Sequence, residues 1–155
     1  MRLLCRIHSA CDARRLKLHI VARGKMGRCP EAELIARYAK RLTWPFQITE
    51  LPDVGGKAPA LLPGSVVVAL DESGVQLGSA EFAQRLSTWR DGGVKECRFL
   101  IGAADGLTAE DLGSSALVLS FGRATWPHML ARAMLVEQLY RATSIIAGHP
   151  YHREG

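Results

Sequence analysis

The sequence predicts an α/β domain with a mostly parallel β-sheet flanked by helices. Short apolar segments of strand length alternate along the chain with longer segments of helical spacing, which is the pattern of β-α-β units. Residues 65–70 (SVVVAL) are continuously apolar and rich in β-branched side chains, as in strands buried on both faces. Glycine and proline clusters separate the segments. A chain of 155 residues is long enough for one such domain with a real core.

The N-terminal half is expected to hold the first three strands and one helix. Pro30 suits a first helical turn because its missing N–H would be unpaired there anyway, and the acidic residues that follow favour a helix start. Residues 52–64 contain three prolines and three glycines and are expected to form a loop. The predicted elements are a strand at Lys17–Ala22, a helix at Pro30–Leu42, a strand at Phe46–Leu51, and a strand at Ser65–Leu70 that ends in a turn at 71–74.

The C-terminal half is expected to alternate between helices and strands. Ser79 is the expected N-cap of the second helix and Thr125 of the last, because a hydroxyl can accept a first-turn N–H. Gly148 is expected to stop the last helix. The predicted elements are a helix at Ala80–Arg90, a strand at Glu96–Ile101, a helical turn at Thr108–Leu112, a strand at Ala116–Leu119 and a helix at Pro127–Ala147.

The last predicted helix carries only three charged residues, Arg132, Glu137 and Arg141. Apolar residues occupy most of its circumference, and such a helix is normally buried. A domain of this size hardly buries every face of one helix. We therefore expect the helix to form part of the core and part of a subunit interface. The alternative is the central helix of a monomeric core.

Residues 1–16 are predicted to be a basic extension that precedes a single domain of residues 17–155. They supply a net charge of +3 out of +5 for the whole chain, and they lack the apolar core of a secretory signal. Residues 1–16 have three possible interpretations: a translation start assigned too far upstream, a disordered arm or a targeting remnant. The small remaining charge does not by itself indicate nucleic-acid binding.

Several classes of protein are disfavoured by what the sequence lacks. Cys5, Cys11, Cys29 and Cys97 form no CxxC pair, so reduced thiols are expected. The histidines show no HExxH or other metal-ligand spacing, and we expect no metal. No segment reaches the roughly 18 apolar residues of a membrane helix. Acyl-transfer hydrolysis is unsupported because no nucleophile elbow is present.

Parallel sheets bind ligands at the carboxyl ends of their strands. Here that rule selects the loops at 70–74, 102–106 and 120–126, which are rich in small and turn-forming residues. The loop IGAADG allows a ligand to approach the backbone closely. It is not a G-x-G-x-x-G fingerprint, which disfavours a dinucleotide-dependent enzyme.

Five motifs together indicate a specific family: HIVARGKM, VALDESG, FLIGAADG, SFGRATWPHMLARAMLVEQLYRA and the terminal GHPYHR. From Lys17 to Arg153 the chain resembles the SPOUT-class ribosomal RNA large-subunit methyltransferase H family. The resemblance implies a C-terminal trefoil knot, which is a rare feature among folds. It also implies a homodimer packed through the last helix, and S-adenosyl-L-methionine as methyl donor.

The resemblance also implies which residues hold the cofactor. They match the three strand-end loops, and they are Leu70, Gly102, Phe121, Gly122, Arg123, Ala124, Thr125 and Trp126. Two residues depart from the usual family pattern: Ala103, where many relatives have a second glycine, and Ala124, where a larger apolar residue is common. Both departures concern cofactor affinity more than activity.

The substrate side is expected to include the C-terminal tail. Arg153 is the candidate for a phosphate or a developing anion, His152 for proton handling or RNA positioning, and Tyr151 accompanies them. A solvated tail is the alternative. Arg23 and Lys25 are candidate RNA contacts, with plain surface charge as the alternative. Glu137 and Arg141 have the spacing of an ordinary helix ion pair.

These expectations converge on a cytoplasmic, S-adenosylmethionine-dependent methyltransferase. The resemblance implies methylation of N3 of a pseudouridine in large-subunit (23S) ribosomal RNA. Because the overall charge is modest, we expect recognition of the assembled ribosome more than of free RNA. The alternative function is a non-catalytic, ribosome-associated RNA-binding module with the same fold.

Overall fold

The computed structural model describes residues 16–153, and its centre is a five-stranded sheet in the order β2-β1-β4-β3-β5 with every neighbouring pair parallel. The strands are β1 (Lys17–Arg23), β2 (Phe46–Leu51), β3 (Val66–Gln76), β4 (Glu96–Ile101) and β5 (Leu117–Ser120). The helices are α1 (Pro30–Ala39), α2 (Ser79–Asp91), α3 (Ala109–Gly113) and α4 (His128–Ile146). The predicted parallel α/β sheet flanked by helices is confirmed.

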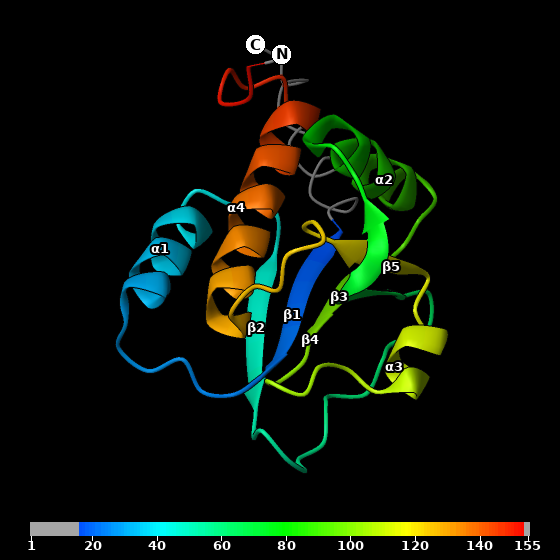
Figure 1. Cartoon of the computed structure of the whole chain (residues 1–155). Coiled ribbons are helices and arrows are strands. Elements are labelled where there is room, and N and C mark those ends of the chain that lie inside the picture. The colour runs from blue at the N-terminus through cyan, green and yellow to red at the C-terminus, as the bar shows by residue number, and fades with distance from the viewer. Residues whose placement is uncertain (1–15, 154–155) are drawn as a thin grey trace, which may run out of the picture.

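The core lies between the sheet and α4, which runs between α1 and α2 (Figure 1). Leu135, Val136 and Leu139 of α4 are fully buried with apolar side chains of the central strands. Ala133 and Ala142 are buried too, but the other apolar residues of α4 are only half-buried, so its apolar surface exceeds what this chain covers. Leu16, the last residue of the predicted extension, is also in the core. The rest of that segment, residues 1–15 with Cys5 and Cys11, lies outside the described residues.

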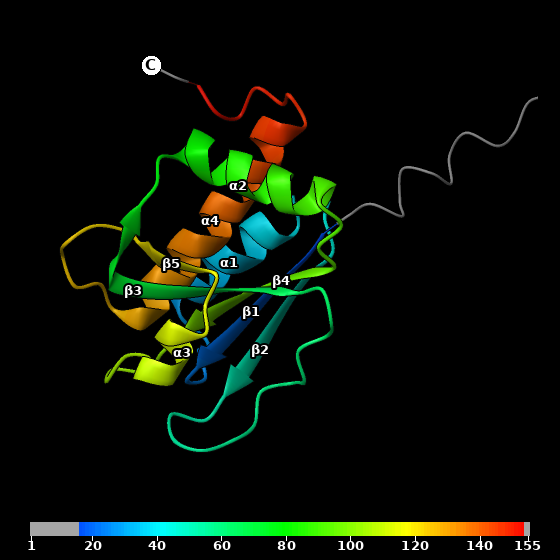
Figure 2. The same cartoon turned by 90° about the vertical axis from the view of Figure 1, so that its right-hand side faces the viewer.

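The opposite face of the sheet is covered by residues 52–64, called the strap below (Figure 2). The Arg98 side chain of β4 holds the strap by donating to the carbonyl oxygens of Pro59, at 2.6 Å, and Ala60, at 3.2 Å. Proline and glycine prevent a regular helix in the strap, so its carbonyl groups remain free to accept bonds from side chains. The predicted loop is confirmed.

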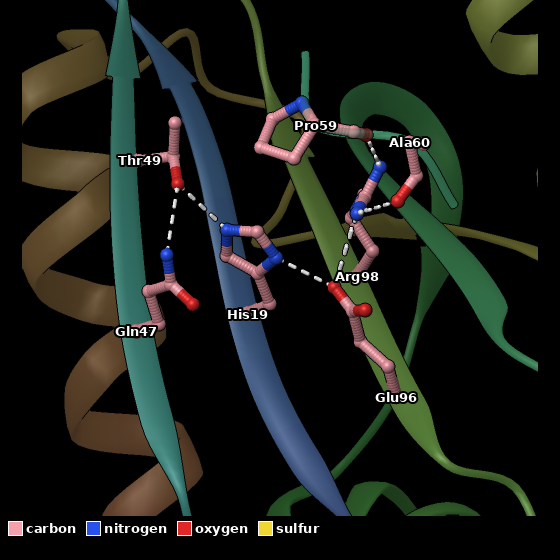
Figure 3. Close-up of polar contacts among 7 residues, drawn as sticks. All are labelled: His19, Gln47, Thr49, Pro59, Ala60, Glu96 and Arg98. Carbon is pink, nitrogen blue, oxygen red and sulfur yellow. Dashed lines mark hydrogen bonds and ion pairs between the residues drawn. The ribbon is translucent and has the colours of Figure 1, made fainter. Parts of the chain in front are cut away.

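Beneath the strap lies a buried polar network that no sequence pattern indicated (Figure 3). His19 Nδ1 lies 2.5 Å from Glu96 Oε1, and its Nε2 lies 2.8 Å from Thr49 Oγ1. A carboxylate only accepts, so Nδ1 carries the proton and Nε2 accepts from the Thr49 hydroxyl. Arg98 is paired with the same Glu96 oxygen at 3.2 Å.

Several predicted boundaries are wrong. The turn expected at 71–74 is part of β3, which bulges there and resumes pairing with β5, so that Leu70 and Val75 both lie opposite Leu119. The N-cap residues are Gly78 and Pro127, not Ser79 and Thr125. Helix α1 ends at Ala39 instead of Leu42. Pairing with β5 accounts for the first difference, and the others are shifts of one to three residues at helix ends.

The His19 network makes stability depend on pH. Burial lowers the pKa of His19 below 6.5, more than the Glu96 carboxylate raises it, since Arg98 already shares that charge. Just below pH 6.5, His19 is therefore protonated in the unfolded chain but still neutral in the folded chain. The free energy of unfolding falls as the pH drops below about 6.5. His19→Gln should flatten this slope, which is at most about 1.4 kcal/mol per pH unit for one proton. Urea midpoints at pH 8, 6 and 5 measure it.

The carboxylate of the network acts in a lower pH window. Burial raises the pKa of Glu96, but the hydrogen bond from His19 and the charge of Arg98 outweigh burial, and the net pKa lies below 4.5. The contribution of Glu96 to the free energy of unfolding is therefore lost only below about pH 4.5. An unchanged slope between pH 6.5 and 5 in His19→Gln would show that a different group causes the acid loss.

Candidate functional site

A cavity of about 310 Å³ opens at the carboxyl ends of β4 and β5 and beside the bulge of β3, at the edge where parallel sheets bind ligands. Its walls come from the three loops selected by the sequence. Seven of the eight predicted cofactor residues line it: Leu70, Gly102, Phe121, Gly122, Ala124, Thr125 and Trp126. Arg123 does not line the cavity. We call this the first cavity.

Gly102 shows why the wall of the first cavity needs a residue without a side chain. A Cβ added there would lie 2.5 Å from the carbonyl carbon of Gly106 and 2.8 Å from the Leu107 nitrogen. The loop turns so tightly that Gly106 N donates to Ala103 O at 2.9 Å, and Gly106 has a φ of +80°. Ala103, the departure from the family pattern, fits this turn with its side chain half-buried.

The bulge of β3 brings an acidic side chain to the opposite wall. Gly74 packs on the β5 backbone, where an added Cβ would lie 2.5 Å from Val118 O. Glu72 thereby reaches the 121–126 loop and accepts a hydrogen bond from the Thr125 hydroxyl at 3.0 Å. Thr125 is therefore not a helix cap: its hydroxyl ties the loop after β5 to β3.

A second cavity of about 430 Å³ lies on the other side of residues 119–122. Leu119, Phe121 and Gly122 line both cavities, so these residues form a shared wall. Glu137 and Gln138 of α4 line the second cavity alone. Gln138 accepts a hydrogen bond from the Ser79 hydroxyl at 2.8 Å, which joins α4 to the start of α2.

The tail folds back on α4 and meets Glu137. Tyr151 donates its hydroxyl to Glu137 Oε1 at 2.9 Å, and its ring lies 4.7 Å from the Arg141 guanidinium. Arg141 forms the expected ion pair with the same carboxylate and lies 3.3 Å from His152 Nδ1. Tyr151 and His152 therefore share one network with Glu137, which the sequence indicated only as the partner of Arg141. Arg153 is exposed and is not part of this network. An isolated carboxylate in a nearly apolar helix was the signal for it.

The chemistry of the network limits what each group can do. Burial raises the pKa of Tyr151 well above 10, and hydrogen bonds to Tyr38 and Glu137 raise it further. Its phenol therefore stays protonated at neutral pH and acts as a donor. The hydrogen bond to Glu137 raises the pKa of Arg141, so this guanidinium remains a permanent cation. Neither cavity is lined by Tyr151, His152 or Arg153 of the same chain.

The two predicted RNA contacts near β1 differ in their surroundings. Arg23 is occupied with the strap, because its Nη1 donates to Pro52 O at 3.0 Å and also to Gly55 O. Lys25 is exposed in the loop that follows β1. Among residues 16–153, no group of three or more His, Cys, Asp or Glu side chains is arranged to hold a metal ion. The same residues contain no helix long and apolar enough to cross a membrane.

A parallel sheet whose carboxyl edge opens into a cavity walled by glycine turns defines a ligand-binding α/β domain. Residues 16–152 match the sequence family described as "Predicted SPOUT methyltransferase". The chain therefore belongs to the SPOUT methyltransferase family, whose members use S-adenosylmethionine as the methyl donor.

Similar proteins share nearly their whole length with this chain. A protein of Sphingopyxis alaskensis named "Ribosomal RNA large subunit methyltransferase H" is 64% identical over 138 residues, which cover 89% of this chain and 97% of that protein. A protein of the same name from Zymomonas mobilis is 58% identical, with 90% and 100% covered. A solved structure titled as a probable methylase family protein from Haemophilus influenzae Rd KW20 has a TM-score of 0.59 at 13% identity, with 90% and 71% covered. The last likeness concerns the fold alone.

Proposed function

We propose that this protein transfers a methyl group from S-adenosylmethionine to N3 of a pseudouridine in large-subunit ribosomal RNA. The observation that carries the proposal is high identity over nearly the whole length to proteins named for methylation of that RNA. A ribosomal substrate implies action in the cytoplasm. Mass mapping of the methylated RNA, described below, identifies the position of the target nucleotide.

The first cavity fits the methyl donor by its shape and its chemistry. Its volume of about 310 Å³ is at the lower end of the range for small-molecule sites. Backbone turns at Gly102 and Gly122 permit close approach of a bent cofactor. Asp71, Glu72 and Asp105 supply negative charge for its cationic groups. When bound, the cofactor would supply an electrophilic methyl group.

The chain's own contribution is positioning and charge. Methyl transfer to a ring nitrogen requires donor and acceptor in line, and holding that geometry lowers the barrier substantially. In our proposal the first cavity holds the donor, the second cavity admits the target base, and the shared wall at 119–122 separates them. Glu137 lines the second cavity and holds Tyr151 and Arg141 beside it. His152 and Arg153 contact the RNA or stabilise the charge that develops as the N3 proton leaves.

We further propose the SPOUT trefoil knot and a homodimer. Membership of the SPOUT family supports the knot, and the half-buried apolar residues of α4 support the homodimer. The half-buried residues include Leu130 and Met134 on the part of α4 near the cavities. A partner's α4 would cover this surface.

Mass mapping of large-subunit RNA tests the function directly. Ribosomes that lack the modification are incubated with the protein and isotopically labelled S-adenosylmethionine. We expect one labelled methyl group on one pseudouridine, and a faster rate on assembled ribosomes than on free RNA. Equal rates would contradict recognition of the assembled ribosome. A folded protein that binds ribosomes but neither binds S-adenosylmethionine nor transfers label would favour the non-catalytic binding module.

A further inference from the structure

Arg132 of α4 is a buried cation that the methyl-transfer proposal leaves without a role. Its side chain is 1% exposed, and its Nε has no hydrogen-bond partner in the described structure. Burying a guanidinium is costly unless its donors and charge are matched, and an apolar side chain would fill the same space. The position of Arg132 therefore calls for an explanation other than packing.

The guanidinium joins three segments that are distant in sequence. Its Nη2 donates to the carbonyl oxygens of Arg23, at 3.2 Å, and Gly24, at 3.0 Å, where β1 ends. Its Nη1 lies 3.4 Å from Glu50 Oε2 of β2. That same Glu50 oxygen accepts the backbone N–H of Met26 at 2.7 Å. Residues 23–28 are called the basic loop below; Arg132 and Glu50 together hold its backbone at Arg23, Gly24 and Met26.

The basic loop lies against the first turn of α4, next to the first cavity. Gly24 has a φ of +89°, and a Cβ added there would lie 3.4 Å from Met129 Cε and 3.6 Å from His128 Nε2. His128 lines the first cavity. Figure 1 shows the connection from β1 to α1 and the start of α4 at the same end of the sheet. The loop is therefore a fixed neighbour of the proposed cofactor site.

The exposed side chains of the basic loop are cationic. Lys25 and Arg28 are both exposed, whereas Arg23 is bound to the strap. Cations on a loop whose backbone is held in place suit phosphate groups, and phosphate contacts set the register of a nucleic acid on a protein.

We propose that Arg132 is a positioning residue for RNA binding: it holds the basic loop beside the first cavity so that Lys25 and Arg28 contact backbone phosphates of the RNA substrate. The inference rests on the proposed function, because it takes RNA as the substrate. It replaces Arg23 with Arg28 as a phosphate contact and assigns the buried Arg132 a role in substrate binding.

Steady-state methylation of ribosomes by loop variants tests the contacts. The double variant Lys25→Ala/Arg28→Ala should raise KM about tenfold and leave kcat within about twofold, since the contacts bind RNA without touching the reacting atoms. The salt dependence of RNA binding should also become shallower, by about one in log–log slope for each phosphate that the variant no longer neutralises. A control variant, Arg85→Ala/Lys95→Ala, removes the same charge from exposed positions on α2 and at the amino end of β4. It should change neither quantity.

A double-mutant cycle tests the role of Arg132. Arg132→Lys keeps the charge but cannot bridge two carbonyls and a carboxylate as the guanidinium fork does. It should raise KM about as much as the loop variant does, with S-adenosylmethionine affinity by calorimetry unchanged. Added to Lys25→Ala/Arg28→Ala, it should have little further effect, because both changes remove the same contacts. Independent, multiplying effects on KM would overturn the role of Arg132.

A second variant covers the case in which Arg132→Lys does not fold. Glu50→Gln, at a position that is 38% exposed, removes only the charge that Arg132 faces. A rise in KM of about threefold with unchanged melting temperature supports the proposal, and an unchanged KM overturns it. If the wild-type protein methylates ribosomes while the loop variants match it in KM and salt slope, this inference fails alone. If the wild type transfers no methyl group, the proposed function fails.

Discussion

Gly102→Ala is expected to reduce S-adenosylmethionine affinity at least 100-fold, or about 2.7 kcal/mol. The added methyl group would lie 2.5 Å from a backbone carbon of Gly106 and 2.6 Å from its oxygen. Backbone atoms cannot move aside by a rotamer change, so the 102–106 loop must open. That loop is one wall of the first cavity. Isothermal titration calorimetry with S-adenosylmethionine measures the loss.

The matched control is Gly113→Ala at the end of α3. A Cβ added to Gly113 meets nothing within 4 Å, so this substitution adds the same methyl group without a clash. Its cofactor affinity and melting temperature should equal those of the wild type within about 0.5 kcal/mol. Gly102→Ala with affinity within threefold of wild type and an intact fold would show that the cofactor does not depend on the 102–106 turn.

The sequence predicted the sheet better than it predicted the edges of the elements. Periodicity and β-branched runs found all five strands, because burial between neighbours leaves a direct mark on composition. The bulge at 71–74 was wrongly predicted as a turn, because D-E-S-G has the composition of a turn and only the pairing with β5 makes it part of a strand. Thr125 likewise has the composition of a cap, and the Glu72 carboxylate decides its actual role.

In the candidate site too, the sequence located the residues that follow a local pattern and missed those that depend on contacts across the fold. The residues of the first cavity follow strand ends, which local pattern locates, and seven of the eight predicted cofactor residues line it. Their contact with the cofactor stays a prediction. Arg23 was assigned to RNA by its charge, but its partners are carbonyl groups of the strap, 29 or more residues away. The His19–Glu96–Arg98 network and the role of Glu137 depend on which side chains face each other across the fold, and no spacing rule encodes that.

Removal of residues 151–155 is expected to lower kcat for ribosome methylation by about 100-fold or more, the cost of losing positioned groups at a reacting centre. The truncation deletes the Tyr151–Glu137 hydrogen bond and the His152–Arg141 contact. Cofactor affinity should stay within about threefold, because the first cavity is not lined by the tail of the same chain. Single-turnover methylation and calorimetry give the two quantities.

Two further variants decide what the tail does. Removal of residues 154–155 alone keeps the tail network and should retain activity. Tyr151→Phe keeps the ring over Arg141 but removes the hydroxyl that donates a hydrogen bond to Glu137. We expect kcat to fall about tenfold, because one hydrogen bond that positions the tail is lost. The raised pKa of Tyr151 keeps its phenol protonated through neutral pH, so the pH–rate profile should have the same shape in this variant.

Full activity after removal of residues 151–155 would place the substrate side elsewhere. Lost turnover with retained cofactor binding would instead assign the tail, and with it the second cavity beside Glu137, to the RNA.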